Sequence, residues 1–442
     1  MKILHYFLGF PPYRSGGLTK FAYDLMISQL EKGNQVGALW PGKMNFVFDK
    51  YTRVKYRSKL NGIDSFEIIN PLPVPLLDGI NDIEKYTKSL QGSDYEKLLK
   101  TIKPDIIHIH TLMGLHSEFL DIANKLKIKT IFTTHDYFGI CPKVNLLKGN
   151  LPCDNDHNCC DCVKCNVNAL SIKKIKLLQS PMYRKFKELY LLKKMRQYYK
   201  NNYEKRKKKS VKTDISLTGE KYKSLRKYYM NMLRKIDVIH FNSTLSKKIY
   251  SRYIKVNDEF VMPITHRNIQ DKRIIKKFED KLRITYLGPT KVYKGFYLLL
   301  DVLDDLYDRN NFELNIYYST QEKRDYLIAH DNYNPGDLEE IFKKTDILVA
   351  PSIWYETFGF TVLEAISYGV PAIISENVGA KDVVGKAAII VNANDYIDLK
   401  DKISFCIHNY EKLTQMNKET FNCVLPDIGI FINGLEDNNE QS

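Results

Sequence analysis

The chain has 442 residues and a mass of 51.6 kDa, and 44% of its residues are hydrophobic. This length and composition exclude a disordered tail or a small module and predict two or three domains. No apolar run approaches the roughly 20 residues that span a bilayer, so we expect a cytoplasmic protein. The formal net charge of +15 suits an anionic partner, such as nucleic acid, anionic lipid or an anionic substrate.

In the first half of the chain, short apolar runs alternate with amphipathic stretches. A helical pattern covers residues 18–33, and the strand-like runs lie at residues 2–7, 35–40, 105–111, 129–135 and 237–243. Such alternation indicates βαβ units and a parallel sheet. The runs are almost continuously apolar, which is typical of strands that are covered on both faces.

Six of the eight cysteines lie between Cys141 and Cys165. In a cytoplasmic protein, such a cluster suggests metal or redox chemistry more than structural disulfides. Cys162 and Cys165 have the C-x2-C spacing of a zinc half-site, and Cys141 with Cys153 is the expected second pair. We expect a structural zinc ion on these four thiolates, with free thiols or disulfides as the alternative. The competing ligands are Cys159, Cys160 and His157.

The positive charge is concentrated in the segment 171–235. It holds 22 Lys and Arg against 4 Asp and Glu, which leaves 45 against 48 in the rest of the chain. Tyr, Leu, Phe and Met are interleaved at roughly helical spacing, so we expect amphipathic helices. The favoured partner is an anionic membrane surface, which would place the protein on the inner face of the cytoplasmic membrane. Nucleic acid is not expected as a partner, because the sequence contains no nucleic-acid recognition module. The alternative without a binding function is a helical insertion whose charges are simply solvated.

The alternation restarts in the second half of the chain. A helical pattern covers residues 296–309, and strand-like runs lie at residues 282–288, 312–318, 325–330, 346–352, 371–376 and 387–391. We therefore predict an α/β protein with two Rossmann-like, doubly wound parallel-sheet domains that face each other across a cleft. The predicted ranges are an N-terminal domain 1–265 with a Cys-rich loop 141–165, a linker 266–281, a C-terminal domain 282–405 and a tail 406–442 that packs back toward the N-terminal domain.

Two glutamates frame a predicted helix start in the second half. Glu356 lies in a loop after an apolar run, and Glu364 lies about one turn into a helix that ends at Gly369. A helix amino terminus presents backbone N–H groups, and Gly359 allows the backbone to approach a ligand closely. This arrangement suits a diphosphate with sugar hydroxyls on both sides. On spacing alone, a helix-starting Glu364 and a solvated Glu356 are equally favoured.

The stretch 346–384, which contains ETFGFTVLE and VGAKDVV, closely resembles the E-x7-E signature of the family 4 retaining glycosyltransferases. Members of that family have the GT-B fold, with two Rossmann-like domains. Further similar segments follow in the family's order and extend the resemblance over most of the chain to about residue 400. They are PPYRSGG, PDIIHIHT, TTHDY, DVIHFNS and LGPTKVYKG.

The resemblance implies a role for each matching residue. Glu364 is similar to the glutamate that binds the nucleotide ribose, Glu356 to the one that contacts the transferred sugar, and Lys294 to the lysine that neutralises the departing phosphate. The histidine facing the donor sugar corresponds to His135. The backbone segment that faces the diphosphate in the family corresponds to Phe358, Gly359, Phe360 and Thr361. The backbone segment that approaches the donor from the other side of the cleft corresponds to Gly16 and Gly17.

One position departs from the family pattern. Many members have Arg directly after the strand glycine, where this chain has Pro289 and Thr290, so Lys291 is the candidate replacement. Taken alone, Lys294 could be a surface lysine, Gly16 with Gly17 a turn, and His135 a packed polar residue. We assign the neighbouring His108 and His110 to packing. Some family members also have a similar cysteine region.

The resemblance implies a retaining glycosyltransferase of the hexosyltransferase type. The expected donor is a UDP- or GDP-sugar, and the expected acceptor is a glycan or a lipid-linked glycan of surface polysaccharide biosynthesis. No cofactor is expected for catalysis. The alternatives are a GT-B nucleotide-sugar epimerase or hydrolase, and a non-enzymatic basic protein that binds lipid or nucleic acid.

Overall fold

The computed structural model describes most of residues 1–429. The residues outside the description are 12, 15, 46–50, 76–78, 91–93, 155–158, 181–182, 184–185, 187–188, 190–214, 279–280, 309–310 and 430–442. His157, the larger part of the basic segment and the end of the predicted tail therefore lie outside the described residues.

Contacts divide the chain into two compact units. The first unit comprises Met1–Gly149, Cys153–His240 and Tyr250–Phe260, and the second comprises Asn150–Pro152, Phe241–Ile249 and Val261–Ser442. This division reflects only which residues of the chain lie near one another. The predicted domain boundaries at residues 265, 281 and 405 therefore stay predictions.

The first unit contains an eight-stranded sheet in the order β10-β9-β6-β5-β1-β2-β4-β3. The pairs from β9 through β4 are parallel, and β3 is antiparallel to β4. The parallel strands follow the doubly wound order, which reverses direction between β1 and β5. The strands are β1 (Lys2–Tyr6), β2 (Gln35–Pro41), β3 (Arg53–Leu60), β4 (Ile63–Ile69), β5 (Ile106–Ile109), β6 (Lys129–Thr133), β9 (Val238–Phe241) and β10 (Asp258–Val261).

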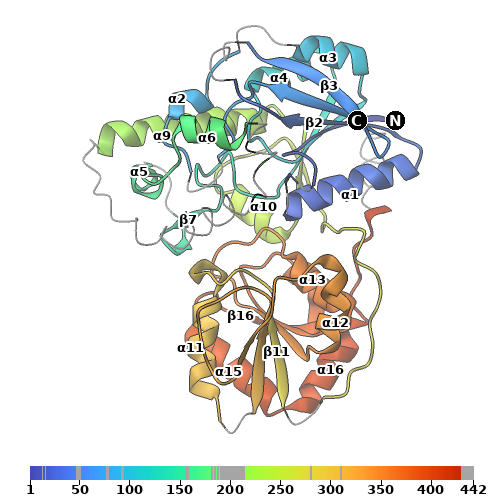
Figure 1. Ribbon diagram of the computed structural model, residues 1–442, viewed down its shortest axis with the longest axis vertical. Coiled ribbons are helices and arrows are strands. Elements are labelled where there is room, and N and C mark those ends of the chain that lie inside the picture. Colours follow the sequence, from blue (N-terminus) through green and yellow to red (C-terminus); the bar gives the residue numbers. More distant parts are fainter. Residues whose placement is uncertain are drawn as a thin grey trace. The chain divides into compact units, whose positions relative to one another are not determined.

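Helices follow the strands of the first half of the chain, as the alternating pattern predicts (Figure 1). They are α1 (Gly17–Glu31), α2 (Ile83–Tyr86), α3 (Tyr95–Ile102), α4 (Ser117–Lys125), α5 (Cys160–Cys165), α6 (Ile172–Leu178), α9 (Ile215–Arg234) and α10 (Thr244–Tyr250). A short hairpin joins β7 (Leu147–Lys148) and β8 (Leu151–Pro152) in the cysteine-rich loop.

The second unit contains a six-stranded, fully parallel sheet in the order β13-β12-β11-β14-β15-β16. This is again the doubly wound order, and it reverses between β11 and β14. The strands are β11 (Leu282–Tyr286), β12 (Phe312–Ile316), β13 (Leu327–Ala329), β14 (Ile347–Ala350), β15 (Ala372–Ser375) and β16 (Ala388–Val391). The helical segments are η2 (Val292–Lys294), α11 (Phe296–Leu306), η3 (Pro335–Asp337), α12 (Leu338–Lys343), α13 (Phe360–Ser367), α14 (Lys381–Val384), η4 (Gly385–Ala387), α15 (Tyr396–Ile407) and α16 (Tyr410–Thr420).

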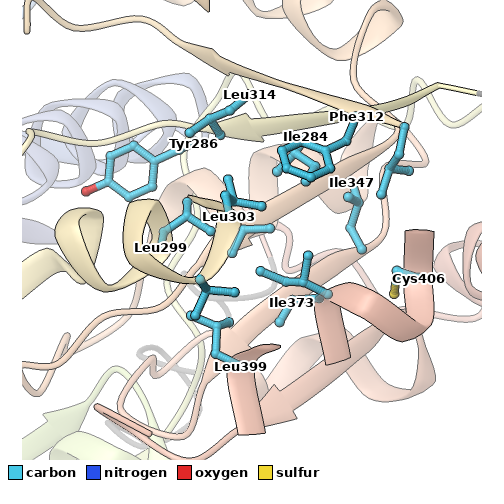
Figure 2. Close-up of a cluster of buried hydrophobic side chains, with 14 of the residues drawn as sticks. Ile284, Tyr286, Leu299, Leu303, Phe312, Leu314, Ile347, Ile373, Leu399 and Cys406 are labelled. Carbon is cyan, nitrogen blue, oxygen red and sulfur yellow. The ribbon is translucent and has the colours of Figure 1, made fainter. Parts of the chain in front are cut away.

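Two apolar clusters cover the two faces of the second sheet. One cluster joins side chains of α11 and α15 to β11 and β12, including Leu299, Leu303, Phe312 and Leu399 (Figure 2). The other joins α12, α13 and α14 to Leu348 of β14 and to Ala372 and Ile374 of β15. These residues alternate with Ile347, Val349 and Ile373 of the first cluster, as the period of two along a strand requires. Burial on both faces explains the almost continuous apolarity of these strands.

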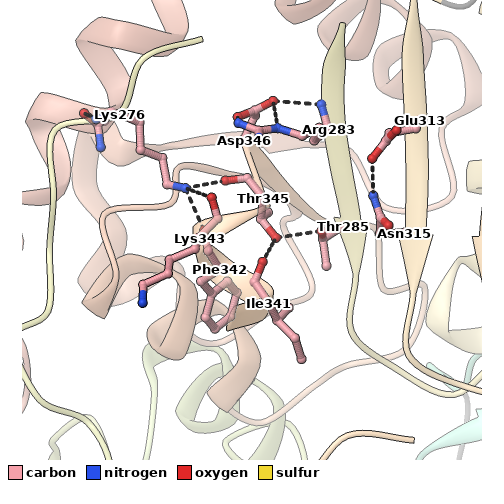
Figure 3. Close-up of polar contacts among 11 residues, drawn as sticks. Lys276, Arg283, Thr285, Glu313, Asn315, Ile341, Phe342, Lys343, Thr345 and Asp346 are labelled. Atoms are coloured by element: carbon pink, nitrogen blue, oxygen red, sulfur yellow. Dashed lines mark hydrogen bonds and ion pairs between the residues drawn. The ribbon is translucent and has the colours of Figure 1, made fainter. Parts of the chain in front are cut away.

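The linker segment is partly buried in the second unit. The Lys276 ammonium donates to the backbone carbonyls of Phe342 and Thr345, each at 2.6 Å (Figure 3). Arg283 and Asp346 form an ion pair beside it, with Nη2 and Oδ1 at 2.7 Å. Farther along the chain, Leu413 of α16 belongs to the same apolar cluster as α11 and α15.

The predicted strands and the two long helical patterns are confirmed. Five described strands were not predicted from the sequence: β3, β4, β7, β8 and β10. Among the described residues, no helix is long and apolar enough to cross a membrane.

Candidate functional site

The order reversal in the second sheet positions the predicted donor residues. β11 and β14 are adjacent, and the loops after their carboxyl ends carry Lys294 and Glu356. Gly295 has φ +74°, and a Cβ at this position would lie 1.9 Å from the carbonyl oxygen of Pro351. Only glycine lets the turn after β11 pass this close to the end of β14.

Lys294 and Glu356 form an ion pair at this end of the sheet. Their Nζ and Oε1 atoms lie 2.9 Å apart, and about a fifth of each side chain is exposed. The Lys294 ammonium also lies 4.9 Å from the centre of the Trp354 ring, a cation–π contact. Two backbone hydrogen bonds join Glu356 to the loop after β15. The Glu356 N–H donates to the Asn377 carbonyl, and the Glu356 carbonyl accepts from the Gly379 N–H. The Lys294 ammonium and the Glu356 carboxylate therefore lie side by side, and backbone hydrogen bonds fix the loop that carries Glu356.

The start of α13 lies in the same loop. The helix begins at Phe360, and Gly359 precedes it with φ +105°, a conformation that favours glycine. The backbone carbonyl of Phe358 accepts from Ala380 at 2.7 Å, which ties the loop down just before the helix. The first N–H groups of a helix have no acceptor within it, so the α13 start offers backbone donors at Phe360 and Thr361. That these donors face a diphosphate stays a prediction.

Glu364 lies one turn into α13 and is paired with a histidine. The His266 Nε2 donates to its Oε1 at 3.0 Å, and His266 is almost fully buried against the edge of Phe360. Burial, followed by the nearby Glu364 carboxylate, raises the pKa of the Tyr333 phenol well above its ordinary value. Glu364 is thus oriented by a buried neighbour that precedes the second sheet in sequence.

The loop between β11 and η2 holds the position where the family pattern has arginine. The backbone carbonyl of Pro289 accepts from the Tyr286 hydroxyl at 2.9 Å and from the Lys291 backbone at 2.7 Å. Lys291 is half-buried and directly precedes η2. Its proposed role as the replacement cation stays a prediction.

In the first unit, Gly16 and His135 flank the start of α1. Gly16 has φ +113° and precedes the helix, which begins at Gly17. His135 follows the end of β6, and the Phe21 ring of α1 lies 5.1 Å from its imidazole. Desolvation, followed by the nearby His240, lowers the pKa of His135 to about 3, so its imidazole is neutral near pH 7.

His135 belongs to a group of buried imidazoles at the carboxyl ends of β1, β5 and β6. His5, His108 and His110 offer ligand atoms that lie within 4.8 Å of one another. Two of the three are joined directly, because the His5 Nδ1 and the His110 Nε2 are hydrogen-bonded at 3.0 Å. Burial of His108 and His110 agrees with their assignment to packing, which did not anticipate the hydrogen bond of His110 to His5.

The cysteine cluster is arranged differently from the predicted zinc quartet. A hydrogen bond joins Cys162 to Cys159, a residue outside the quartet, and raises the pKa of the Cys162 thiol. The Arg226 guanidinium lies 3.4 Å from the Cys159 sulfur. Within the part of the chain that the structure describes, the quartet does not form a compact group of ligand atoms. A structural zinc ion on Cys141, Cys153, Cys162 and Cys165 stays a prediction.

The described end of the basic segment is an integral part of the first unit. In α9, Leu225, Tyr229 and Leu233 are buried at helical spacing. The Tyr229 hydroxyl donates to the backbone carbonyl of Tyr86 at 2.8 Å. The exposed face carries basic residues, including Lys223 and Lys227. The amphipathic helix is therefore confirmed here, and its apolar face is occupied by the protein itself.

Comparisons with known proteins agree with this architecture. Residues 268–422 match the family model described as Glycosyl transferases group 1. A 42.6 kDa protein from the cps region of Klebsiella pneumoniae is 24% identical over 404 residues, which cover 88% of each chain. Sucrose-phosphate synthase from Thermosynechococcus elongatus has a TM-score of 0.58 at 12% identity, covering 99% of this chain and 98% of that one. Anabaena HepE in complex with UDP and glucose has a TM-score of 0.55 at 12% identity, covering all of both chains.

These matches confirm the predicted α/β GT-B fold and support a group 1 glycosyltransferase. The residues beside the predicted site that sequence reasoning missed are His266 and His5. Nothing in the sequence around His266 indicates its contact with Glu364, because the two residues lie 98 positions apart. A signal for His5 did exist, since it and His108 occupy corresponding positions near the ends of two apolar runs.

Proposed function

We propose that the chain is a retaining glycosyltransferase that moves a sugar from a nucleoside diphosphate sugar to an acceptor hydroxyl. The observation that carries the proposal is the Lys294–Glu356 pair at the order reversal of the second sheet, beside the start of α13. Anionic phosphate is favoured where a lysine and helix N–H groups meet. Glu364, one turn into the helix, is placed to accept hydrogen bonds from ribose hydroxyls.

The proposed mechanism assigns one task to each of these groups. As the bond to the anomeric carbon breaks, the sugar gains positive charge and the diphosphate gains negative charge. Lys294 and the first amides of α13 would stabilise the diphosphate without a metal ion. Glu356 and His135 would hold the transferred sugar, and exclusion of water would protect the donor from hydrolysis. By resemblance to its family, the reaction proceeds on one face of the sugar, and Glu356 is not a covalent nucleophile.

The proposed donor is a UDP- or GDP-sugar. A structural neighbour, Anabaena HepE, is known in complex with UDP and glucose, which supports this class of donor. The proposed acceptor is a lipid-linked glycan of surface polysaccharide synthesis, supported by the relative from a cps region. Exposed lysines of the basic segment would attract anionic lipids at the inner face of the cytoplasmic membrane.

The deciding experiment measures UDP and GDP release from a panel of nucleotide sugars, with and without membrane extract. We expect release that depends on the extract, and a product that keeps the anomeric configuration of the donor. Equal release without any acceptor would favour an epimerase or hydrolase. Binding of anionic vesicles without any donor turnover would favour a non-enzymatic protein.

A matched pair of variants tests the assignment of Glu356. Glu356→Gln removes the carboxylate that pairs with Lys294, and we expect turnover to fall about 100-fold or more, while nucleotide affinity survives. Glu411→Gln makes the same chemical change on α16, at an exposed residue, and should leave turnover unchanged. Turnover of Glu356→Gln within a few-fold of the parent would show that this glutamate does not contact the reacting sugar.

A further inference from the structure

Four buried or half-buried side chains of the first unit form a hydrogen-bonded row that ends at His135. The Gln29 Oε1 lies 2.7 Å from the His5 Nε2, and the His5 Nδ1 lies 3.0 Å from the His110 Nε2. The His110 Nδ1 then lies 3.3 Å from the His135 Nε2. We call these four residues the imidazole row. It connects α1 to the carboxyl ends of β1, β5 and β6.

The three imidazoles of the row are neutral near pH 7. Burial lowers the pKa of His5 to about 4, and burial with the neighbouring histidines holds the pKa of His110 well below its ordinary value. The pKa of His135 is lowered to about 3. A neutral imidazole has one nitrogen that donates and one that accepts. Every hydrogen bond along the row must therefore point in the same direction.

Gln29 sets that direction because its Oε1 can only accept. The His5 Nε2 must then carry the proton, which leaves the His5 Nδ1 as an acceptor. The His110 Nε2 donates to it, and the His110 Nδ1 accepts in turn. By the same logic, the His135 Nε2 carries a proton and donates to His110, so the His135 Nδ1 is an acceptor.

We infer that Gln29 acts as a positioning residue that fixes the tautomer of His135 through His5 and His110. The inference rests on the proposed function, in which His135 meets a hydroxyl of the transferred sugar. In the fixed tautomer, the His135 Nδ1 accepts a hydrogen bond from that hydroxyl. If the row ran in the opposite direction, Nδ1 would donate instead. Because one tautomer of His135 is already set before the donor binds, binding does not require a change of tautomer.

Packing holds the row in place. The Phe21 ring of α1 lies 5.9 Å from the His110 ring and 5.1 Å from the His135 ring. The His5 and His110 rings are nearly parallel, at 11° and 5.3 Å. Gln29 is almost fully buried on the same helix as Phe21. The helix α1 supplies both the Phe21 ring that packs on His135 and the Gln29 amide that sets its tautomer. One helix therefore determines where the His135 imidazole lies and which of its nitrogens carries the proton.

The first test reads the tautomer directly, without donor. In protein labelled with 15N histidine, the nitrogen shifts distinguish a protonated from an unprotonated imidazole nitrogen, and the spectrum of His135→Asn identifies the signals of His135. We expect Nε2 protonated and Nδ1 unprotonated in the parent protein. A chelator should leave these signals unchanged. Protonation of His135 at Nδ1, or a change of its signals on metal removal, would overturn the inference.

The second test changes the end of the row. Gln29→Met keeps the side-chain volume but removes the fixed acceptor, so His135 should become a mixture of tautomers, and turnover should fall about five- to tenfold with little change in the donor KM. Gln29→Glu, while its carboxylate is ionised, can only accept and should keep the parent tautomer. Ser28→Ala, at the neighbouring buried position of α1, should change neither quantity. An unchanged His135 tautomer in Gln29→Met would refute the role of Gln29.

The two readouts separate this inference from the proposed function. The tautomer is measured without donor, so it reports on the row even if no nucleotide sugar is turned over. Absence of turnover with the expected tautomer would refute the glycosyltransferase proposal and leave the row intact. Should Gln29→Met fail to fold, the parent protein and Gln29→Glu still decide the direction of the row.

Discussion

Five buried or half-buried histidines make the first unit sensitive to acid. They are His5, His108, His110, His116 and His135, and burial lowers the pKa of each. A histidine whose pKa is lowered in the folded state binds a proton more readily after unfolding. Its contribution to stability is complete above the unfolded pKa and is lost as the pH falls below it, toward the folded pKa. We therefore predict that the free energy of unfolding declines steeply below about pH 6.5.

The size of the effect follows from the proton balance. Between pH 7.5 and pH 5.5, an unfolded histidine takes up nearly one proton and its buried counterpart almost none, which lowers the free energy of unfolding by ~1.4 kcal/mol. Five such groups give ~7 kcal/mol on the same basis. Asp136 opposes them, because burial raises its pKa to about 7 and the folded state takes up the proton in this range. That gain is ~2 kcal/mol, so the expected net loss is ~5 kcal/mol, within the usual stability of a whole domain.

The chain contains two tryptophans, which allows the first unit to be followed by itself. Trp40 lies in β2 of the first unit and Trp354 in the second. In Trp354→Phe, urea unfolding monitored by Trp40 fluorescence at both pH values gives the free energy directly. A loss below about 1 kcal/mol between the two pH values would refute the proton balance.

Two variants check the assignment of the effect. His116→Gln removes one buried imidazole and should reduce the net loss by ~1.4 kcal/mol, somewhat more than a quarter, since each histidine contributes equally in this range. His408→Gln replaces an exposed histidine at the end of α15 in the second unit, and should not alter the pH dependence of the Trp40 signal. Equal effects of the two substitutions would contradict burial as the cause.

The remaining predictions concern the second unit, followed by Trp354 fluorescence in Trp40→Phe. Lys276→Met removes the ammonium that donates to the Phe342 and Thr345 carbonyls and should lower the free energy of unfolding by about 3 kcal/mol, whereas exposed Lys277→Met should change it by less than about 0.5. Similar effects of both lysine variants would show that the contacts of Lys276 are not stabilising. Gly295→Ala forces a Cβ against the Pro351 carbonyl at positive φ and should cost about 2 kcal/mol or more and weaken nucleotide binding, while Gly336→Ala, with nothing within 4 Å, should be tolerated. A fully stable Gly295→Ala would mean that the turn before α11 can move.

Most of the fold could be predicted from the sequence, because buried parallel strands have a strong apolar signal. The missed hairpin of β3 and β4 shows the limit. β3 is an exposed edge strand whose residues alternate weakly, so its pattern resembles a loop. Its turn, Asn61–Gly62, does carry the sequence typical of a tight hairpin, and both residues have positive φ. That local signal was present and was overlooked.

The sequence by itself determined the buried apolar strands and the helix start beside Gly359, because these depend on periodicity and spacing over a few tens of residues. Its resemblance to the family 4 glycosyltransferases singled out Glu356 and Glu364 as the candidate pair. Only the tertiary structure decided which side chains meet. The pairing of His266 with Glu364 and the row from Gln29 to His135 depend on strand order and register, which bring residues about a hundred positions apart within hydrogen-bond distance. A hydrogen bond needs its two atoms placed to within a few tenths of an ångström, and local sequence preferences do not specify positions that closely.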